Sequence, residues 1–284
     1  MAETEQPSRT VGPRSNELAL RVCSALVLIP LAIGTSYLGG WTFALFWGVA
    51  ALGVLWEWIS LVAGSDRRSA LMTGAAALVL AFALAASGRH LLAAVIVLAM
   101  GVLATAALAR AERRIWVAGA IPYAGALGVA PIVLRSDSSD GFLAMMFLFA
   151  IVWSTDIVAY FVGRAVGGPK LMPRVSPKKT WSGALGGTVA AIMVALAVAK
   201  VAALTGWLAI AMLAVVLSVF AQGGDLFESF LKRRFDAKDS SHLIPGHGGL
   251  MDRLDGFVTA SVIAALIGLA RGGFEAPGRG LLVW

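Results

Sequence analysis

The sequence predicts an all-α, polytopic integral membrane protein with about nine transmembrane helices. Of its 284 residues, 59% are hydrophobic and only 14% are charged, whereas soluble domains carry about a quarter charged residues. The mean hydropathy is +0.83, and several apolar stretches are long enough to cross the roughly 30 Å hydrocarbon core of a bilayer. This composition excludes a large soluble domain.

The apolar stretches divide the chain into a short tail and one membrane-embedded domain. Residues 1–17 are polar and are expected to form a disordered cytoplasmic tail, and residues 18–284 form the single domain. Nine stretches are long or apolar enough to be predicted as spans, the last of them short. They cover residues 18–37, 41–62, 69–87, 91–109, 115–134, 142–163, 182–203, 207–223 and 257–270.

The positive charges predict the orientation of these spans. With a cytoplasmic N-terminus, most of the 23 Lys and Arg residues fall in cytoplasmic segments, as the positive-inside rule requires. Both long polar segments, 164–182 and 224–256, then face the cytoplasm, which predicts a protein of the cell membrane. The net charge of +7 is therefore a topology signal, and no nucleic-acid partner is expected. The single cysteine, Cys23, excludes an intrachain disulfide and a thiolate zinc site.

Segment 224–256 concentrates the charge of the chain. It contains six carboxylates and five cations: Asp225, Glu228, Asp236, Asp239, Asp252 and Asp255, with Lys232, Arg233, Arg234, Lys238 and Arg253. Asp252 and Asp255 are three residues apart and share a helix face. Before them, Gly248 and Gly249 belong to a turn whose N–H groups can approach an anion. Clustered carboxylates beside such a turn predict a hard cation that holds a phosphate.

Segment 164–182 carries five cations and no acid. Around Lys178 and Lys179, it can be read as positive-inside charge with an interfacial tryptophan, or as a clamp for a triphosphate. Asp156 lies inside a predicted span, on one helix face with Tyr160 and Arg164. It is expected either to form a wall of the site or to be an aspartate that water reaches near the cytoplasmic end of the helix. Glu57, also inside a span, is expected only to pair with a neighbouring helix or the interface.

Together, thirteen positions of the second segment resemble the signature of phosphatidate cytidylyltransferases, also called CDP-diglyceride synthases. They are Ser229, Lys232, Arg233, Lys238, Asp239, Ser241, Pro245, His247, Gly248, Gly249, Asp252, Arg253 and Asp255. So many positions in a short segment are a specific signal. Residues 176–181 resemble the second conserved block of that family, but Ser182 stands where an acidic residue is expected. Asp156 and the Gly163–Arg164 pair also match.

The resemblance implies transfer of a cytidylyl group from CTP to phosphatidic acid in the bilayer, and a homodimer. It favours the clamp and the site wall among the readings above. The expected catalytic residues are Asp225, Lys238, His247, Asp252, Arg253 and Asp255, with His247 as a hydrogen-bond donor. The expected substrate-binding residues are Asp156, Ser176, Lys178, Lys179, Thr180, Lys232, Arg233, Gly248 and Gly249. Asp225, Asp252 and Asp255 are the expected Mg²⁺ ligands, and K⁺ is a candidate for a second cation.

Two other classes of protein are compatible with parts of this pattern. One is another CTP-dependent lipid enzyme, such as a polyprenol kinase or an ether-lipid cytidylyltransferase, which would differ in the lipid that it binds. The other is a transporter, since polar residues inside spans suit a transport path. The charges gather in two cytoplasmic segments rather than along a path through the bilayer, which disfavours the transporter.

Overall fold

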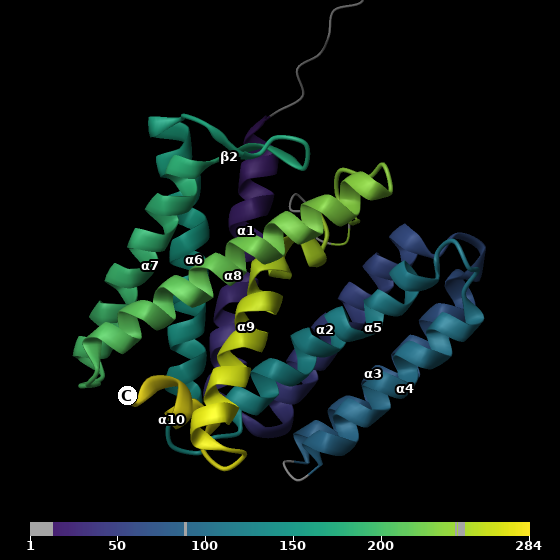
Figure 1. Cartoon of the computed structure of the whole chain (residues 1–284), viewed down its shortest axis with the longest axis horizontal. Helices are drawn as coiled ribbons and strands as arrows, with labels where there is room; N and C mark the ends of the chain where they lie inside the picture. The colour runs from purple at the N-terminus through teal and green to yellow at the C-terminus, as the bar shows by residue number, and fades with distance from the viewer. Residues whose placement is uncertain (1–13, 88–89, 242, 244–247) are drawn as a thin grey trace, which may run out of the picture.

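The computed structural model of the chain describes residues 14–87, 90–241, 243 and 248–284, and these residues are almost entirely helical (Figure 1). The long helices are α1 (Arg14–Leu38), α2 (Gly40–Val62), α3 (Arg67–Ala86), α4 (Leu91–Leu108), α5 (Arg114–Arg135), α6 (Gly141–Val166), α7 (Trp181–Val201), α8 (Trp207–Arg234) and α9 (Met251–Gly272). The shorter elements are the 3-10 turn Gly64–Asp66, the strands β1 (Lys170–Met172) and β2 (Ser176–Thr180), and α10 (Pro277–Leu282).

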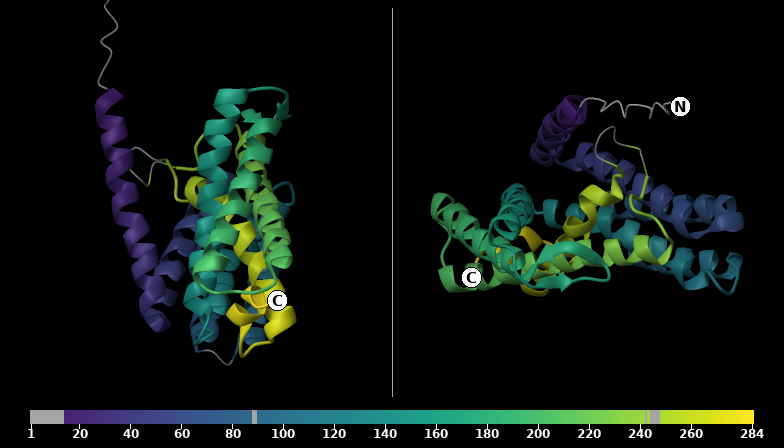
Figure 2. Two further views of the ribbon diagram at one scale, coloured as in Figure 1. Left: turned by 90° about the vertical axis from the view of Figure 1, so that its left-hand side faces the viewer. Right: turned by 90° about the horizontal axis from the view of Figure 1, so that it is seen from above.

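Each predicted span coincides with one of the long helices. In the described part of the chain, eight helices are long and apolar enough to cross a membrane, which confirms the predicted all-α, polytopic class. The first described residues and the C-terminus lie at opposite ends of the bundle (Figures 1 and 2).

Two helices differ from the prediction because they extend into the charged segment 224–256. Helix α8 continues to Arg234 instead of ending at residue 223, and α9 begins at Met251 instead of residue 257. Hydropathy marks where apolar residues end, whereas a helix continues as long as its backbone hydrogen bonds continue. Most of the acidic residues of this segment therefore lie on helix ends, and not in a long loop.

The other polar segment forms a small hairpin that the sequence did not predict. Strands β1 and β2 pair antiparallel, with Lys170 opposite Thr180 and Met172 opposite Ser176. Thr180 then caps α7, because its hydroxyl oxygen accepts the N–H of Gly183 at 3.1 Å. Capping of this kind satisfies a backbone donor at the start of a helix. The hairpin therefore ends at a fixed point on the bundle.

Helices α6, α7 and α8 pack closely through small and hydroxyl side chains. A buried small residue recurs at every fourth position of α7: Gly183, Gly187, Ala191, Ala195 and Ala199. Such stripes let helix backbones approach in a membrane. The Ser218 hydroxyl of α8 lies 3.0 Å from that of Thr155 and 3.1 Å from that of Thr188. These contacts fix the helices that carry Asp156 and Asp225.

At the opposite end of the bundle, a buried aspartate joins the turn before α6 to α10. The Asp137 carboxylate accepts the N–H groups of Ser139 at 2.9 Å, Asp140 at 3.0 Å and Arg279 at 2.8 Å. Burial by itself raises the pKa of Asp137, but these hydrogen bonds outweigh burial and lower the pKa below its usual value. The C-terminal helix is thus held to the bundle far from the charged segments (Figure 1).

Candidate active site

A close crossing of α8 and α9 brings the two acidic helix ends together (Figure 1). A Cβ atom on Gly256 would lie 2.9 Å from the carbonyl oxygen of Ala221, and one on Gly224 would collide with the carbonyl oxygen of Asp255. Only glycine permits this approach at both positions. Asp225, next to Gly224, and Asp255, next to Gly256, therefore lie at the crossing.

Three carboxylates and one lysine gather at this crossing from four elements. We call Asp156 of α6, Asp225 of α8, Asp255 of α9 and Lys179 of β2 the carboxylate cluster. Lys179 forms an ion pair with Asp225, and Asp255 interacts electrostatically with Asp225, Asp156 and Lys179. The predicted site wall Asp156, one predicted clamp lysine and two of the three predicted metal ligands therefore lie in one region. Mutual repulsion of three carboxylates favours a site that receives a cation.

A second group of charges lies beside the carboxylate cluster and is more deeply buried. The Lys232 ammonium is 2.7 Å from Glu228 and 2.6 Å from Asp252, and the Glu228 side chain is only 1% exposed. One Glu228 oxygen, Oε1, is buried without a hydrogen-bond partner among the described residues. We call Lys232, Glu228, Asp252, Ser240 and Glu57 the Lys232 network.

Within the Lys232 network, Asp252 accepts hydrogen bonds from Ser240 and Gly249, two residues that lie between α8 and α9. Its carboxylate accepts the N–H and the hydroxyl of Ser240, both at 3.1 Å, and the N–H of Gly249 at 2.8 Å. Gly248, with φ +83°, allows the turn that aims the Gly249 N–H at Asp252. The sequence predicts that this N–H binds a phosphate, whereas in the structure it binds a carboxylate of the protein. Gly249 is thus part of the support of the site.

The sequence did not predict that Glu57 lies beside the candidate site. Its carboxylate is fully buried and accepts the N–H groups of Leu250 at 2.8 Å and Met251 at 2.6 Å. It also accepts the hydroxyls of Ser240 at 3.1 Å and Ser241 at 2.5 Å. The one signal in the sequence was an acid inside an apolar span, which is itself unusual. Glu57 ties the N-terminal half of the chain to the start of α9.

Several residues predicted to bind substrate have structural partners instead. Thr180 is the buried cap of α7, and its hydroxyl lies 3.0 Å from that of Ser182. The Ser182 hydroxyl donates to the Gly167 carbonyl, so it ties the start of α7 to the end of α6. Lys232 forms ion pairs with both Glu228 and Asp252, and its side chain is only 12% exposed.

The remaining predicted cations lie at the surface of the protein. Lys178, Arg233, Lys238 and Arg253 are exposed, and Ser176 of β2 is half-buried. Arg164 donates to the Tyr160 hydroxyl at 3.0 Å, which agrees with the predicted shared face of α6. His247 lies outside the described residues.

The donor chemistry of the carboxylate cluster fits a hard cation such as Mg²⁺, which prefers carboxylate oxygens. Within the described ranges, however, no three His, Cys, Asp or Glu side chains converge closely enough to form a ready metal site. Two of the three predicted metal ligands instead form ion pairs with lysines: Asp225 with Lys179, and Asp252 with Lys232.

These features define a class of protein: a polytopic membrane protein with a charged site, suited to phosphate esters, at one end of its helices. The chain belongs to the cytidylyltransferase family, whose model matches residues 19–270. It is 42% identical over 253 residues to phosphatidate cytidylyltransferases of Brucella abortus (strain 2308) and Brucella suis, which covers 89% of this chain and 94% of each relative. A phosphatidate cytidylyltransferase of Bacillus subtilis is 43% identical over 128 residues, 45% of this chain and 48% of that relative.

Proposed function

We infer that this chain transfers the cytidylyl group of CTP to phosphatidic acid. An oxygen of the lipid phosphate forms a bond to the α-phosphorus of CTP, and the bond to the β-phosphate breaks. The products are CDP-diacylglycerol and pyrophosphate. Family membership supports this reaction, and the observation that carries it is the carboxylate cluster with Lys179, which adjoins the cationic hairpin β1–β2.

Repulsion between two polyanions is the main problem in this reaction. A phosphate monoester has a second pKa of about 6 and is largely ionised near neutral pH, so the nucleophile needs no strong general base. Cations of the hairpin and of segment 224–256 can offset the charge of the triphosphate. We assign this role to Lys178, Lys179, Lys238 and Arg253, and we assign the lipid phosphate to Arg233, since Lys232 already pairs with two carboxylates.

Asp225 and Asp255 are the residues that we propose to hold Mg²⁺, after Lys179 turns from Asp225 to the triphosphate. When bound, the cation would polarise the α-phosphate and neutralise the departing pyrophosphate. Asp252, the third ligand expected from the sequence, already accepts donors on both oxygens. We therefore propose that Asp252 orders the site, and that Glu57 orders it through Ser240 and the first residues of α9.

The test of the reaction is a product assay with purified protein, CTP, phosphatidic acid and Mg²⁺. We expect CDP-diacylglycerol and pyrophosphate in equal amounts, and loss of both when a chelator removes the metal. Formation of CDP together with a phosphorylated lipid would identify a kinase instead. Failure to consume CTP with any lipid would return the transporter to consideration.

We propose that the site end of the bundle faces the cytoplasm, where CTP is found, as the positive charges predict. Ser138, at the other end, and Arg234, at the end of α8, are both exposed. In a Cys23→Ala background, Ser138→Cys should react with an impermeant maleimide in intact cells. Arg234→Cys should react only after the membrane is opened. The reverse pattern would place the site away from CTP and contradict the proposed orientation.

A further inference from the structure

The polar face of α6 continues beyond the carboxylate cluster. Tyr160 lies one helical turn after Asp156 and Arg164 lies two turns after it, on the same side of the helix. Asp156 interacts electrostatically with Asp225 and Lys179, so this side of α6 faces the site. Tyr160 is 59% exposed, and Arg164 is exposed as well. The reaction as proposed leaves both residues without a role.

The hairpin β1–β2 is attached to the end of α6 that carries Arg164. A Cβ atom on Gly163, the residue before Arg164, would lie 2.9 Å from the Thr180 hydroxyl oxygen. Lys179, which pairs with Asp225, directly precedes Thr180. This end of α6 is therefore fixed beside the proposed triphosphate site.

A hydrogen bond holds the two side chains of α6 together. The Arg164 guanidinium donates through Nη1 to the Tyr160 hydroxyl at 3.0 Å. A guanidinium has five N–H donors, and within the described part of the chain this is the one hydrogen bond that Arg164 donates. An exposed aromatic ring beside such a planar donor suits a flat heterocycle, because the ring can stack on its face and the guanidinium can donate to its edge.

The hydrogen-bonding edge of cytosine matches these donors. Its O2 and N3 atoms are adjacent acceptors, and a planar guanidinium can donate to two neighbouring acceptors at once. Uracil carries an N–H donor at N3, which a guanidinium cannot accept because it has no acceptor of its own. The arginine can therefore distinguish the two pyrimidines.

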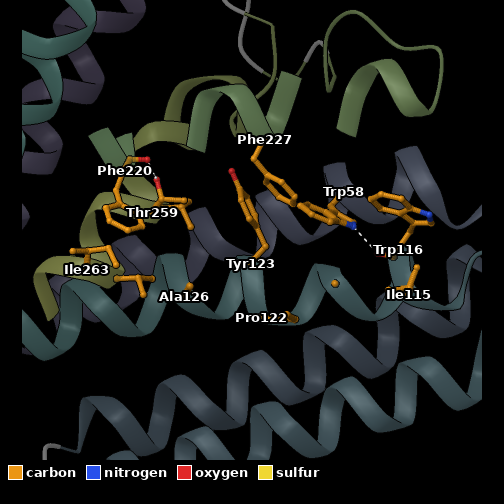
Figure 3. Close-up of a pocket in the computed structure, with 13 residues that line it drawn as sticks. Trp58, Ile115, Trp116, Pro122, Tyr123, Ala126, Phe220, Phe227, Thr259 and Ile263 are labelled. Atoms are coloured by element: carbon orange, nitrogen blue, oxygen red, sulfur yellow. Dashed lines mark hydrogen bonds between the residues drawn. The ribbon is translucent and has the colours of Figure 1, made fainter. Parts of the chain in front are cut away.

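An apolar groove between α2, α5, α8 and α9 offers no comparable group (Figure 3). Its volume is about 560 Å³, and none of the described side chains that line it, such as Trp58, Tyr123 and Phe227, is charged. Burial of the polar edge of a base without hydrogen-bond partners is unfavourable. The exposed face of α6 is thus the better match for a base.

We propose that Tyr160 and Arg164 bind the cytosine base of CTP: the Tyr160 ring stacks on the base, and Arg164 donates to its O2 and N3 atoms. This inference rests on the proposed function and adds the residues that select the nucleotide. At about 1.5 Å per residue, Arg164 lies about 12 Å further along the helix axis than Asp156. That distance leaves room for the ribose between the base and an α-phosphate at the carboxylate cluster.

Arg164→Lys tests the contact with the edge of the base. Lysine keeps the positive charge but lacks the planar fork. The KM for CTP should rise about thirtyfold, the scale of hydrogen bonds from a charged group, whereas the inhibition constant of UTP against CTP should change less than about twofold. The matched control is Arg68→Lys, at an exposed arginine of α3, which should change neither constant. The KM for phosphatidic acid and the thermal unfolding temperature should hold in both variants.

Two substitutions of Tyr160 separate the ring from the hydroxyl. Stacking tolerates any base, so Tyr160→Ala should weaken both CTP and UTP, by about tenfold or more. Tyr160→Phe keeps the ring and removes only the acceptor that orients Arg164. It should raise the KM for CTP alone, by about fivefold, the scale of one hydrogen bond.

Equal losses for CTP and UTP in Arg164→Lys would assign Arg164 to the phosphates, and unchanged constants would make the two residues interfacial anchors. Either result overturns the base site. If the unaltered protein uses CTP and UTP equally well, it does not select the base, and the inference fails. If it makes no CDP-lipid at all, the proposed function fails instead.

Discussion

Asp255→Asn is expected to lower turnover by two to three orders of magnitude while the protein remains folded. Asp255 lies at the centre of the carboxylate cluster, at the close crossing of α8 and α9. Asparagine keeps the size of the side chain but removes the negative charge that a hard cation requires. Loss of a group that stabilises developing charge costs about 10²–10³ in kcat. The measurement is the initial rate of CDP-diacylglycerol formation at saturating CTP and lipid.

Asp236→Asn is the matched control for this change. Asp236 is an exposed residue of the same charged segment, with φ +54°, a conformation that asparagine adopts readily. The turnover of the Asp236→Asn variant should match that of the unaltered protein. Equal losses in the two variants would show that the carboxylates of the segment are not differentiated, and the assignment of Asp255 would have to be withdrawn.

Glu57→Gln is expected to lower turnover by about a hundredfold, the upper range for residues that act by orienting others. The carboxylate accepts two N–H groups and two hydroxyls. An amide has only one oxygen, and its NH₂ group would face a backbone donor, so the start of α9 would lose its anchor. The loss should appear in kcat and in KM for CTP, because Asp252 shares Ser240 with Glu57.

A purely structural role of Glu57 would lower thermal stability without changing the kinetics of the folded fraction. Glu112→Gln, at an exposed turn between α4 and α5, controls for loss of one acid and should leave kcat and KM unchanged. Limited proteolysis between residues 240 and 250 gives a second measurement, since Glu57→Gln should speed cleavage there. Normal kinetics per folded molecule in Glu57→Gln would refute its positioning role.

If both predictions hold, the site consists of two groups of residues with different roles. The carboxylate cluster would face substrates and metal, and the Lys232 network would hold the connecting segment in place. Lys232 illustrates the difference. From the sequence it is one of several cations near a membrane surface, whereas in the structure it bridges Glu228 and Asp252. Removal of one partner of such a buried pair leaves an uncompensated charge.

The sequence alone determined the fold class, the approximate position of each span and the family to which the chain belongs. A transmembrane helix is defined by its own apolar length, so each predicted span needed no knowledge of its neighbours. The signature around Asp252 and Asp255 is local in the same sense, although the structure places Asp252 in the Lys232 network and Asp255 in the carboxylate cluster. The resemblance to cytidylyltransferases also depends only on the order of residues along the chain.

Only the tertiary structure decided which charges face one another. Hydropathy could not show that α8 and α9 continue into the charged segment. It also could not show that Gly224 and Gly256 let the two helices cross closely enough to bring Asp225 near Asp255. The partners of Glu57 lie more than 180 residues further along the chain, and spacing carries no information over such a distance. Inside a membrane protein, a buried carboxylate must find donors wherever the packing places them, and that packing is a property of the whole bundle.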